Sequence, residues 1–361
     1  MRYYIIAGEA SGDLHGSNLI KSLYTNDPEA TIRFWGGDAM AKVAGEPVKH
    51  IRDLAFMGFV EVIKHLPTIL KNISFCKKDI HKFRPDVVIL IDYPGFNFRL
   101  FKFLKLHSFK TIYYISPQLW AWKQSRVKKV REYVDRLYVI FPFEVEFYQK
   151  HGIIAHYFGH PLLDAFTVTK NDVRENTIAL LPGSRKQEIA YLLPEMVKMA
   201  NHFSDYQFVV AGMSIHGQDF YQNLIGNANV KVEFDSTYPL LRKSTAALVT
   251  SGTATLETAL HFVPQVICYK SNYLSYRIAK WLVKGIEFIG IVNLIAGKKI
   301  AEELIQQDVN EMRLKAELSA ILTPEKRNLI LADYEALVAK LGNSGSSRRV
   351  AEDMVGWMRS F

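Results

Sequence analysis

Four loops contain the residue types that bind or transfer phosphorylated groups. Residues 8–13 read GEASGD, residues 91–97 read IDYPGFN, residues 181–189 read LPGSRKQEI and residues 250–257 read TSGTATLE. Each comes at the end of an apolar run and precedes a segment with a helical pattern. Such strand-to-helix loops present backbone N–H groups at a helix N-terminus, where anions bind. These loops are therefore the candidate ligand-binding segments.

The first loop could hold an anionic group on its backbone N–H groups. Its glycines lack the G-x-G-x-x-G spacing of a dinucleotide fingerprint. The alternative is an ordinary turn in which Ser11 or Asp13 caps the following helix. The residues alone leave both interpretations open.

Asp92 is the candidate acid–base residue of the second loop. It ends the buried run 86–92, and open α/β sheets bind ligands outside the carboxyl ends of their strands. A carboxylate there can remove a proton from a hydroxyl group, with a pKa set by its neighbours. The alternative is an Asx-type cap on the Pro94–Gly95 turn.

The third loop favours binding of a diphosphate. Gly183 and Ser184 follow a proline in a tight turn with free N–H groups, and Arg185 can bind a phosphate with two hydrogen bonds. The loop is not a P-loop, because the G-x-x-x-x-G-K-[ST] spacing is absent. The alternative is a surface turn with a solvated Arg–Lys pair.

The fourth loop is a second candidate anion site. Ser251, Gly252 and Thr253 end a strand and begin a helix. Glu257, near the start of that helix, could accept hydrogen bonds from ribose hydroxyls. The alternative is a capped helix with Glu257 in a favourable first-turn position.

Neither a disulfide scaffold nor a metal site is predicted. Cys76 and Cys268 are the two cysteines and lie far apart, which fits a reducing compartment. His156 and His160 have H-x-x-x-H spacing, but Pro161 disfavours the continuous helix that would place both on one face.

The chain carries an excess of positive charge, which predicts an anionic partner. Its 361 residues include 45 Lys+Arg and 36 Asp+Glu, a net charge of +9. Residues 93–131 contain no acidic residue but many bulky aromatics and nine Lys or Arg. Such a segment could bind nucleic acid or an anionic bilayer surface. The alternative is a core of aromatics with solvated cations.

Residues 57–75 show apolar spacing typical of a helix, which Pro67 would kink or restart. This face could be core, or it could contact an acyl chain or a membrane. The apolar run 3–7 is too short for a signal-peptide core, and no uncharged run approaches a membrane span. We expect a cytoplasmic protein, soluble or peripheral.

Strand and helix patterns alternate in two halves, which predicts two doubly wound, Rossmann-like α/β domains facing a cleft, with C-terminal helices. A polar linker at 166–176 separates the halves, and the chain from about 301 onward is expected to be mostly helical. The expected strands are 2–7, 86–92, 111–115 and 136–140, then 177–181, 206–211, 230–234, 246–250 and 265–269.

Taken together, the motifs resemble those of the lipid-A-disaccharide synthase family, in family order over nearly the whole chain. They are GEASGD at 8–13, MGFVEV at 57–62, PDVVILIDYPGFN at 85–97, YISPQLWAWKQSR at 114–126, FPFE at 141–144, GHPL at 159–162, LPGSR at 181–185, SGTATLE at 251–257 and NLIAG at 293–297.

The resemblance implies an inverting, metal-independent glycosyltransferase of the two-domain B type (GT-B), with no cofactor. It implies a UDP-2,3-diacylglucosamine donor and a 2,3-diacylglucosamine 1-phosphate acceptor, which give a β-1,6-linked disaccharide 1-phosphate and UDP. The implied domains are an acceptor- and membrane-side domain (1–168), a UDP-sugar domain (175–343) and a terminal helix (344–361) that packs back or is exchanged in a homodimer.

The resemblance also implies residue roles. Asp92 would be the base, with Glu9 and Ser11 nearby on the acceptor side, and Arg185, Glu257 and Asn293 would serve donor binding or activity. Together with the anion loops, the expected substrate-binding set is Gly183, Ser184, Arg185, Ser251, Gly252, Thr253, Glu257 and Asn293.

The positive charge is then expected to serve the acceptor phosphate and the cytoplasmic face of the inner membrane. The cluster expected to do so is Lys123, Arg126, Lys128 and Lys129. Two alternatives stay open at this point. One is a GT-B enzyme acting on UDP-N-acetylglucosamine without acyl chains, and the other is a non-catalytic lipid- or RNA-binding protein.

Overall fold

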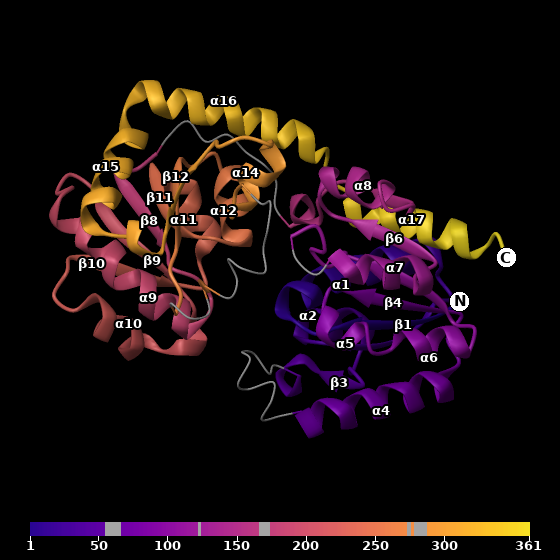
Figure 1. Ribbon diagram of the computed structural model, residues 1–361. Coiled ribbons are helices and arrows are strands. Elements are labelled where there is room, and N and C mark those ends of the chain that lie inside the picture. The colour runs from indigo at the N-terminus through magenta and orange to yellow at the C-terminus, as the bar shows by residue number, and fades with distance from the viewer. Residues whose placement is uncertain (55–65, 122–123, 166–173, 273–275, 278–286) are drawn as a thin grey trace. The chain divides into compact units, whose positions relative to one another are not determined.

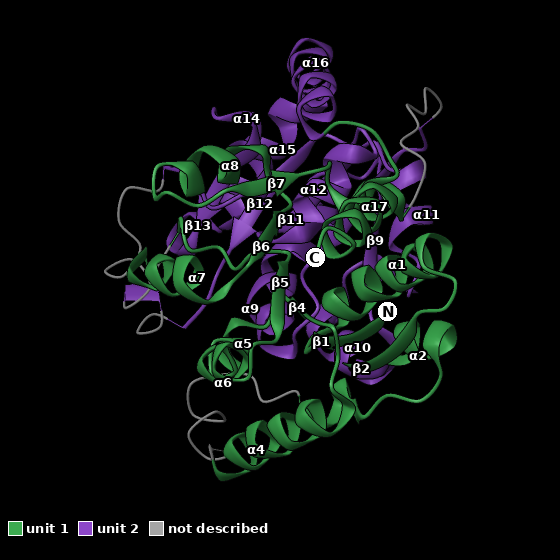
Figure 2. Ribbon diagram, turned by 90° about the vertical axis from the view of Figure 1, so that its right-hand side faces the viewer, with its two compact units in different colours: residues 1–165, 342–361 green, residues 166–341 purple. Residues whose placement is uncertain are grey.

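The computed structural model describes residues 1–54, 66–121, 124–165, 174–272, 276–277 and 287–361. The chain divides into two compact units, which Figures 1 and 2 show: unit 1 is Met1–Ala165 with Gly342–Phe361, and unit 2 is Phe166–Leu341. Each unit is a parallel sheet with helices on both faces, the α/β architecture that the sequence predicts.

Unit 1 is built on a seven-stranded parallel sheet in the order β3-β2-β1-β4-β5-β6-β7. The strands are β1 Arg2–Ala7, β2 Thr31–Gly36, β3 Lys49–His50, β4 Val87–Ile91, β5 Lys110–Tyr114, β6 Arg136–Val139 and β7 Ala155–Tyr157. The helices are α1 Ala10–Asn26, α2 Asp38–Ala44, α4 Leu66–Phe83, α5 Pro94–Asn97, α6 Phe101–Leu106, α7 Val127–Tyr133, α8 Pro142–Gln149 and α17 Ser346–Met358.

Successive residues of the central strands pack into two separate cores. Tyr4 and Ile6 belong to the core under α4 to α8, whereas Tyr3 and Ile5 belong to the core under α1, α2 and α17. Because side chains alternate along a strand, a strand covered on both faces needs an unbroken apolar run. This explains why the four strands expected in this half are confirmed.

Helix α17 returns to unit 1 and packs against α1. Its N-terminus is held by the Asp164 carboxylate, which accepts hydrogen bonds from the backbone N–H groups of Gly345, Ser346 and Ser347 at 2.6, 3.1 and 2.8 Å. Further along, Asp353 pairs with Arg136. Exchange of this helix between the subunits of a dimer stays a prediction.

Unit 2 is built on a six-stranded parallel sheet in the order β10-β9-β8-β11-β12-β13. The strands are β8 Thr177–Leu181, β9 Gln207–Gly212, β10 Val230–Phe234, β11 Ala246–Thr250, β12 Gln265–Tyr269 and β13 Glu302–Ile305. The helices are α9 Lys186–Met196, α10 Gln218–Ile225, α11 Thr237–Lys243, α12 Thr253–Leu260, α14 Ile291–Ala296, α15 Glu311–Leu322 and α16 Pro324–Leu341.

Strand β13 corrects the expectation of a mostly helical tail from about 301. It is an edge strand that begins with two glutamates, and only Leu304 of its four residues is buried. A strand with one buried side chain lacks the apolar run on which strand prediction depends. Strands β2, β3 and β7 were missed for a similar reason, because each is short or partly exposed.

Both sheets contain a switch point, where neighbouring strands connect in opposite directions. It lies between β1 and β4 in unit 1 and between β8 and β11 in unit 2. Ligands of open α/β sheets bind outside the carboxyl ends of the strands at such points. The four candidate loops follow these four strands. Within the described ranges, no helix combines the length and apolar composition needed to cross a bilayer.

The Asp164 cap predicts a measurable contribution to stability. Asp164→Ala removes the acceptor of three backbone N–H groups, so we expect the free energy of unfolding in urea to fall by about 1–3 kcal/mol. The control is Asp333→Ala, which removes only an ion pair with exposed Lys298 and should cost less than about 1 kcal/mol. Equal losses in the two variants would contradict the capping role.

Candidate active site

The first and second loops lie side by side at the switch point of unit 1. Ala7, the last residue of β1, is paired in register with Ile91, the last residue of β4. Gly8 therefore follows β1 at the level at which Asp92 follows β4, and Glu9 comes one residue later. Glu9 is the half-buried N-cap residue of α1, Asp92 is half-buried and Ser11 is exposed.

The loop after β4 has an unusual backbone. Asp92 and Tyr93 both have left-handed conformations, with φ values of 42° and 49°. Such conformations cost on the order of 1–3 kcal/mol for each non-glycine residue and are typically held by surrounding contacts. One such contact is with Gly8, where a Cβ atom would lie 2.3 Å from the Tyr93 ring. Only glycine therefore fits beneath this ring.

The Asp92 carboxyl is poised to exchange a proton near neutral pH. Burial raises its pKa to about 6, and the nearby charge of Glu9 contributes to the increase. A hydrogen bond from the backbone N–H of Tyr93 acts in the opposite direction. A general base works best when its pKa lies close to the operating pH, so this carboxylate suits that role.

Asp13, the last residue of the first loop, is structural. Its carboxylate accepts hydrogen bonds from the backbone N–H groups of Gly37, Ala39 and Met40 at 2.6, 2.9 and 3.1 Å. It thus caps α2. The alternative in which Ser11 or Asp13 caps the following helix is not observed, because both residues lie inside α1, whose N-cap is Glu9.

Glu144, in the FPFE motif, is a buried carboxyl that the sequence analysis did not single out. Its Oε2 accepts hydrogen bonds from the backbone N–H groups of Ile140 and Phe141 at 3.2 and 3.0 Å. Burial raises its pKa to about 8, and the charge of Asp92 contributes a smaller increase. Burial therefore favours the protonated, uncharged form of Glu144.

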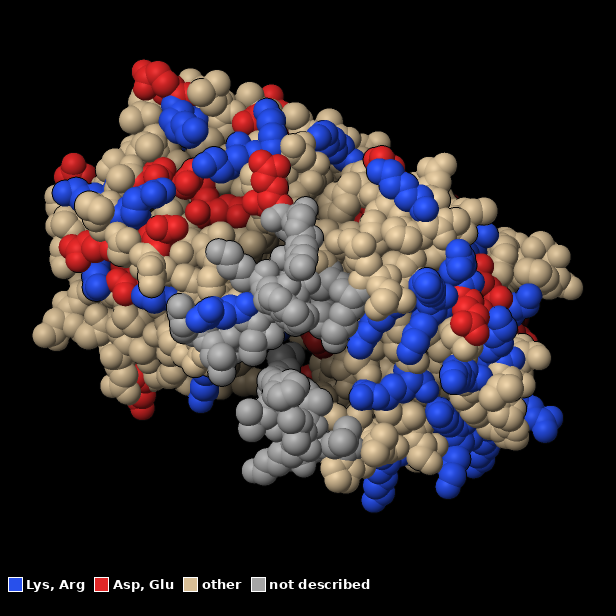
Figure 3. Space-filling model, in the orientation of Figure 1, with Lys and Arg blue, Asp and Glu red and all other residues tan. Residues whose placement is uncertain are grey.

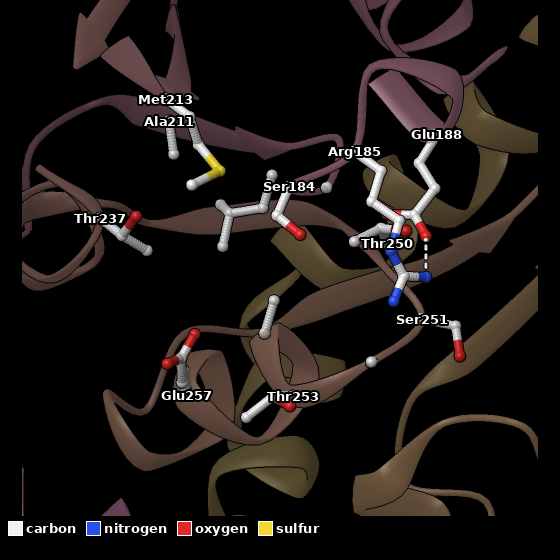
Figure 4. A pocket seen from close by; sticks show the side chains of 14 residues that line it. Ser184, Arg185, Glu188, Ala211, Met213, Thr237, Thr250, Ser251, Thr253 and Glu257 are labelled. Atoms are coloured by element: carbon white, nitrogen blue, oxygen red, sulfur yellow. Dashed lines mark hydrogen bonds and ion pairs between the residues drawn. The ribbon is translucent and has the colours of Figure 1, made fainter. Parts of the chain in front are cut away.

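The third and fourth loops enclose a cavity of about 370 Å³ at the switch point of unit 2 (Figure 4). It contains seven of the eight residues expected to bind substrate: Gly183, Ser184, Arg185, Ser251, Gly252, Thr253 and Glu257. The cavity has seven further lining residues, which are Leu181, Glu188, Ala211, Met213, Thr237, Thr250 and Ala254. Four of them lie within the two quoted loops, whereas Ala211, Met213 and Thr237 belong to or follow β9 and β10 and were not predicted.

Arg185 is exposed at the mouth of this cavity and forms an ion pair with Glu188 at 3.0 Å (Figure 4). Gly183 has a φ of 118°, and a Cβ atom there would lie 2.8 Å from Oε2 of Glu188. The carbonyl oxygen of Ser184 lies 2.8 Å from Nε2 of His216. These contacts shape the loop and leave the Arg185 guanidinium accessible to an anion.

Glu257 approaches the same cavity from α12 (Figure 4). Burial raises the pKa of its carboxyl, and the Tyr238 hydroxyl donates a hydrogen bond to it at 3.0 Å. A carboxylate fixed in this way can accept hydrogen bonds from ligand hydroxyls. The cavity therefore has a cation and backbone N–H groups near one wall. At another wall it has a carboxylate that can accept hydrogen bonds from hydroxyl groups.

Asn293 lies outside this cavity. Its side chain is fully buried, donates to the Ala301 carbonyl and the Glu303 carboxylate, and accepts from the N–H groups of Ile300 and Ala301. These bonds use both ends of the amide to shape the segment before β13. The structure thus gives Asn293 a role in organising a loop and does not place it with the other expected substrate-binding residues.

The expected basic cluster is partly described. Lys128 and Lys129 are exposed on α7, and the Arg126 guanidinium lies over the Phe98 ring at 5.2 Å. Lys123 and the MGFVEV motif at 57–62 lie outside the described residues. Many aromatics of the acid-free segment are core, among them Phe96, Phe101, Tyr113 and Tyr114. For those rings, the core interpretation holds.

A family model described as lipid-A-disaccharide synthetase matches residues 3–354. The chain belongs to the lipid-A-disaccharide synthase family. The lipid-A-disaccharide synthases of Syntrophus aciditrophicus and Geobacter metallireducens are 40% and 38% identical to it over 367 residues. These alignments cover 96% and 97% of this chain and 95% of each relative.

Solved structures show the same fold at low sequence identity. A putative UDP-N-acetylglucosamine 2-epimerase from Listeria monocytogenes matches with a TM-score of 0.68 and 13% identity, over 99% of this chain and 97% of that one. The calicheamicin glycosyltransferase CalG4 matches with a TM-score of 0.61 and 14% identity, over 100% and 98%. The predicted family and GT-B fold are confirmed, and the chain is a glycosyltransferase of lipid A disaccharide formation.

The raised pKa of Asp92 has a consequence for stability. The folded-state pKa of about 6 lies above the ordinary value of about 3.9, so charging this carboxyl destabilises the fold as pH rises toward and past 6. We expect Asp92→Asn to raise the free energy of unfolding at pH 8 by about 1–3 kcal/mol and to leave it unchanged near pH 3, below the unfolded-state pKa. The control is Glu46→Gln, at an exposed carboxyl of the same unit. A loss of stability at pH 8 in Asp92→Asn would contradict the burial argument.

Proposed function

We propose that the enzyme transfers the sugar of UDP-2,3-diacylglucosamine to 2,3-diacylglucosamine 1-phosphate. The products are the β-1,6-linked disaccharide 1-phosphate and UDP. The observation that supports this proposal is that the two switch points present different chemical groups. One presents a carboxyl with a pKa of about 6, and the other presents an anion-binding cavity with Arg185 at its mouth.

The cavity of unit 2 suits the UDP part of the donor. The backbone N–H groups of residues 183–185 and 252–254 and the Arg185 guanidinium would bind the diphosphate. Glu257 would accept hydrogen bonds from the ribose hydroxyls. In support, a solved S. aureus structure with this fold, TM-score 0.69 at 12% identity, is described as a complex with UDP.

Asp92 would act on the acceptor. Its carboxylate removes the proton of the 6-hydroxyl while that oxygen attacks the anomeric carbon of the donor sugar. The bond from this carbon to the diphosphate oxygen breaks, and UDP leaves with the electron pair. A single displacement of this kind inverts the anomeric configuration. Glu9 follows β1 near Asp92, and we propose that Glu9 and Ser11 contact the acceptor.

A metal ion is not required for this step. The charge that develops on the leaving diphosphate can be balanced by Arg185 and by the N–H groups of the two loops. We therefore expect the step to depend on side chains of the protein itself, so that their substitution lowers its rate. We propose a metal-independent reaction on this basis, with no cofactor.

Release of UDP from UDP-2,3-diacylglucosamine tests the proposal. We expect turnover only when the monosaccharide 1-phosphate acceptor is also present, and we expect it to persist in excess EDTA.

Asp92→Asn should lower kcat by roughly 10²–10⁴-fold, as for loss of a general base. Arg185→Ala should mainly weaken UDP binding, whereas Arg313→Ala, an ion-paired arginine of the same unit outside the cavity, should change neither. Full turnover in folded Asp92→Asn would exclude the base role.

We also propose that unit 1 docks on an anionic membrane, on the cytoplasmic face of the inner membrane. Figure 3 shows Lys and Arg side chains gathered over α4, α6 and α7, which cover one face of the sheet. Apolar side chains are exposed in the same layer: Leu70 and Phe75 on α4 are 54% and 47% exposed, and Leu106 at the end of α6 is 83% exposed. Cations with interspersed apolar residues suit a bilayer surface that holds acylated substrates.

Flotation with liposomes tests this docking face. Combined alanine substitutions of Lys123, Arg126, Lys128 and Lys129 should weaken binding to anionic liposomes at low salt at least tenfold, since each cation near such a surface contributes about 1 kcal/mol. Lys21→Ala with Lys315→Ala removes exposed charge elsewhere and should change binding less. Unchanged flotation of the fourfold variant would show that this cluster is not the docking site.

A further inference from the structure

Two buried side chains converge on one backbone carbonyl, that of Asp92. The Asn97 Nδ2 donates a hydrogen bond to this oxygen at 2.7 Å, and the Tyr113 hydroxyl donates another at 2.6 Å. Both side chains are fully buried, with 0% exposure. Asn97 ends α5, directly after the loop, whereas Tyr113 belongs to the neighbouring strand β5. The loop is thus attached both to its own helix and to the sheet.

This carbonyl lies at the point where the chain leaves the sheet. Ladder pairing of β4 ends at Ile91, and the backbone N–H of Asp92 still donates to the Tyr114 carbonyl at 3.2 Å. The next peptide joins two left-handed residues, with φ values of 42° and 49°. Left-handed residues that bear a Cβ persist only when their surroundings fix them. The two hydrogen bonds to the Asp92 carbonyl supply such a restraint.

The direction of this carbonyl also fixes the direction of the Asp92 side chain. Once the orientation of the Asp92–Tyr93 peptide plane and the φ angle of Asp92 are set, the direction of the Asp92 Cα–Cβ bond is fixed. The Tyr93 ring packs against Gly8 on one side and stacks on Phe96 at 5.4 Å, so the peptide cannot rotate freely. A small change at the carbonyl would therefore move the carboxylate, and misplacement by about 1 Å can cost a hundredfold in rate.

We propose that Asn97 and Tyr113 are positioning residues that hold the Asp92 carboxylate in its reactive orientation through its own backbone carbonyl. This inference rests on the proposed role of Asp92 as the base. Neither residue needs to touch a substrate. The quoted motif 85–97 includes Asn97, but the sequence does not show that its amide turns back to the strand end.

The electrostatics of the pair agree with this role. Burial raises the pKa of Tyr113 well above its ordinary value, so its hydroxyl remains a donor throughout the pH range of the reaction. The pKa of Asp92 is raised mainly by burial. If the loop relaxed, the carboxylate would gain water and its pKa would fall. Loss of either restraint should therefore change both the rate and the pH dependence.

The test uses Tyr113→Phe and Asn97→Leu, with Tyr114→Phe as the matched control. Tyr114 is the next residue of β5 and is equally buried, but its ring packs in the core on the opposite face of the sheet. In the full-length enzyme we expect kcat to fall at least tenfold in the first two variants. The acid limb of kcat/KM should move to lower pH, and affinity for UDP should not change. Tyr114→Phe should match the unsubstituted enzyme.

The outcomes separate this inference from the proposed function. If Tyr113→Phe and Asn97→Leu both fold and match Tyr114→Phe in kcat and in the acid limb, the positioning role is wrong, even where Asp92→Asn is inactive. If Asp92→Asn retains full turnover, the base assignment itself fails. Should Asn97→Leu not fold, Tyr113→Phe decides, because it removes a single oxygen atom. A fall in kcat with an unmoved acid limb would indicate general loosening and would also overturn the proposal.

Discussion

The parallel pairing of β1 with β4 is the contact on which the candidate chemistry depends. It ends the two strands at the same level, with Ala7 opposite Ile91, so that Glu9 and Asp92 emerge together at a sheet edge. The pairing of β8 with β11 does the same for the diphosphate loops of unit 2, where Leu181 is opposite Val249. One topological rule, repeated in both units, therefore brings together loops that lie about 70 to 85 residues apart in the sequence.

The number of backbone partners separates structural from reactive carboxylates. Asp13 and Asp164 each accept three backbone N–H groups and serve as helix caps. Asp92 is half-buried. Its backbone partner is the N–H of Tyr93, which lowers its pKa, and the charge of Glu9 lies nearby. Burial raises the pKa of a carboxyl when hydrogen bonds and nearby positive charges do not fully stabilise its ionised form. The fold thus uses similar side chains for stability in one place and for proton transfer in another.

The sequence predicts the central strands and the loops that follow them, because buried parallel strands are continuous apolar runs and their carboxyl ends carry the ligand site. It does not predict β13, whose single buried residue gives no such run. Nor does it predict which way a polar side chain turns. Asn293 and Asn97 both lie in recognisable motifs, yet their amides bond to nearby backbone. Tyr113 reaches the Asp92 loop through a tertiary contact that no local pattern encodes. Glu188, by contrast, lies three residues after Arg185 and pairs with it within one loop.

The pH dependence of kcat/KM tests the central claim most directly, because it reports the pKa of the essential base in the free enzyme. We expect kcat/KM to rise with pH through an acid limb centred near 6. We also expect Glu9→Gln to move this limb to lower pH, since it removes the negative charge that disfavours ionisation of Asp92. A limb centred at the ordinary aspartate value of about 4, and unmoved by Glu9→Gln, would contradict the account.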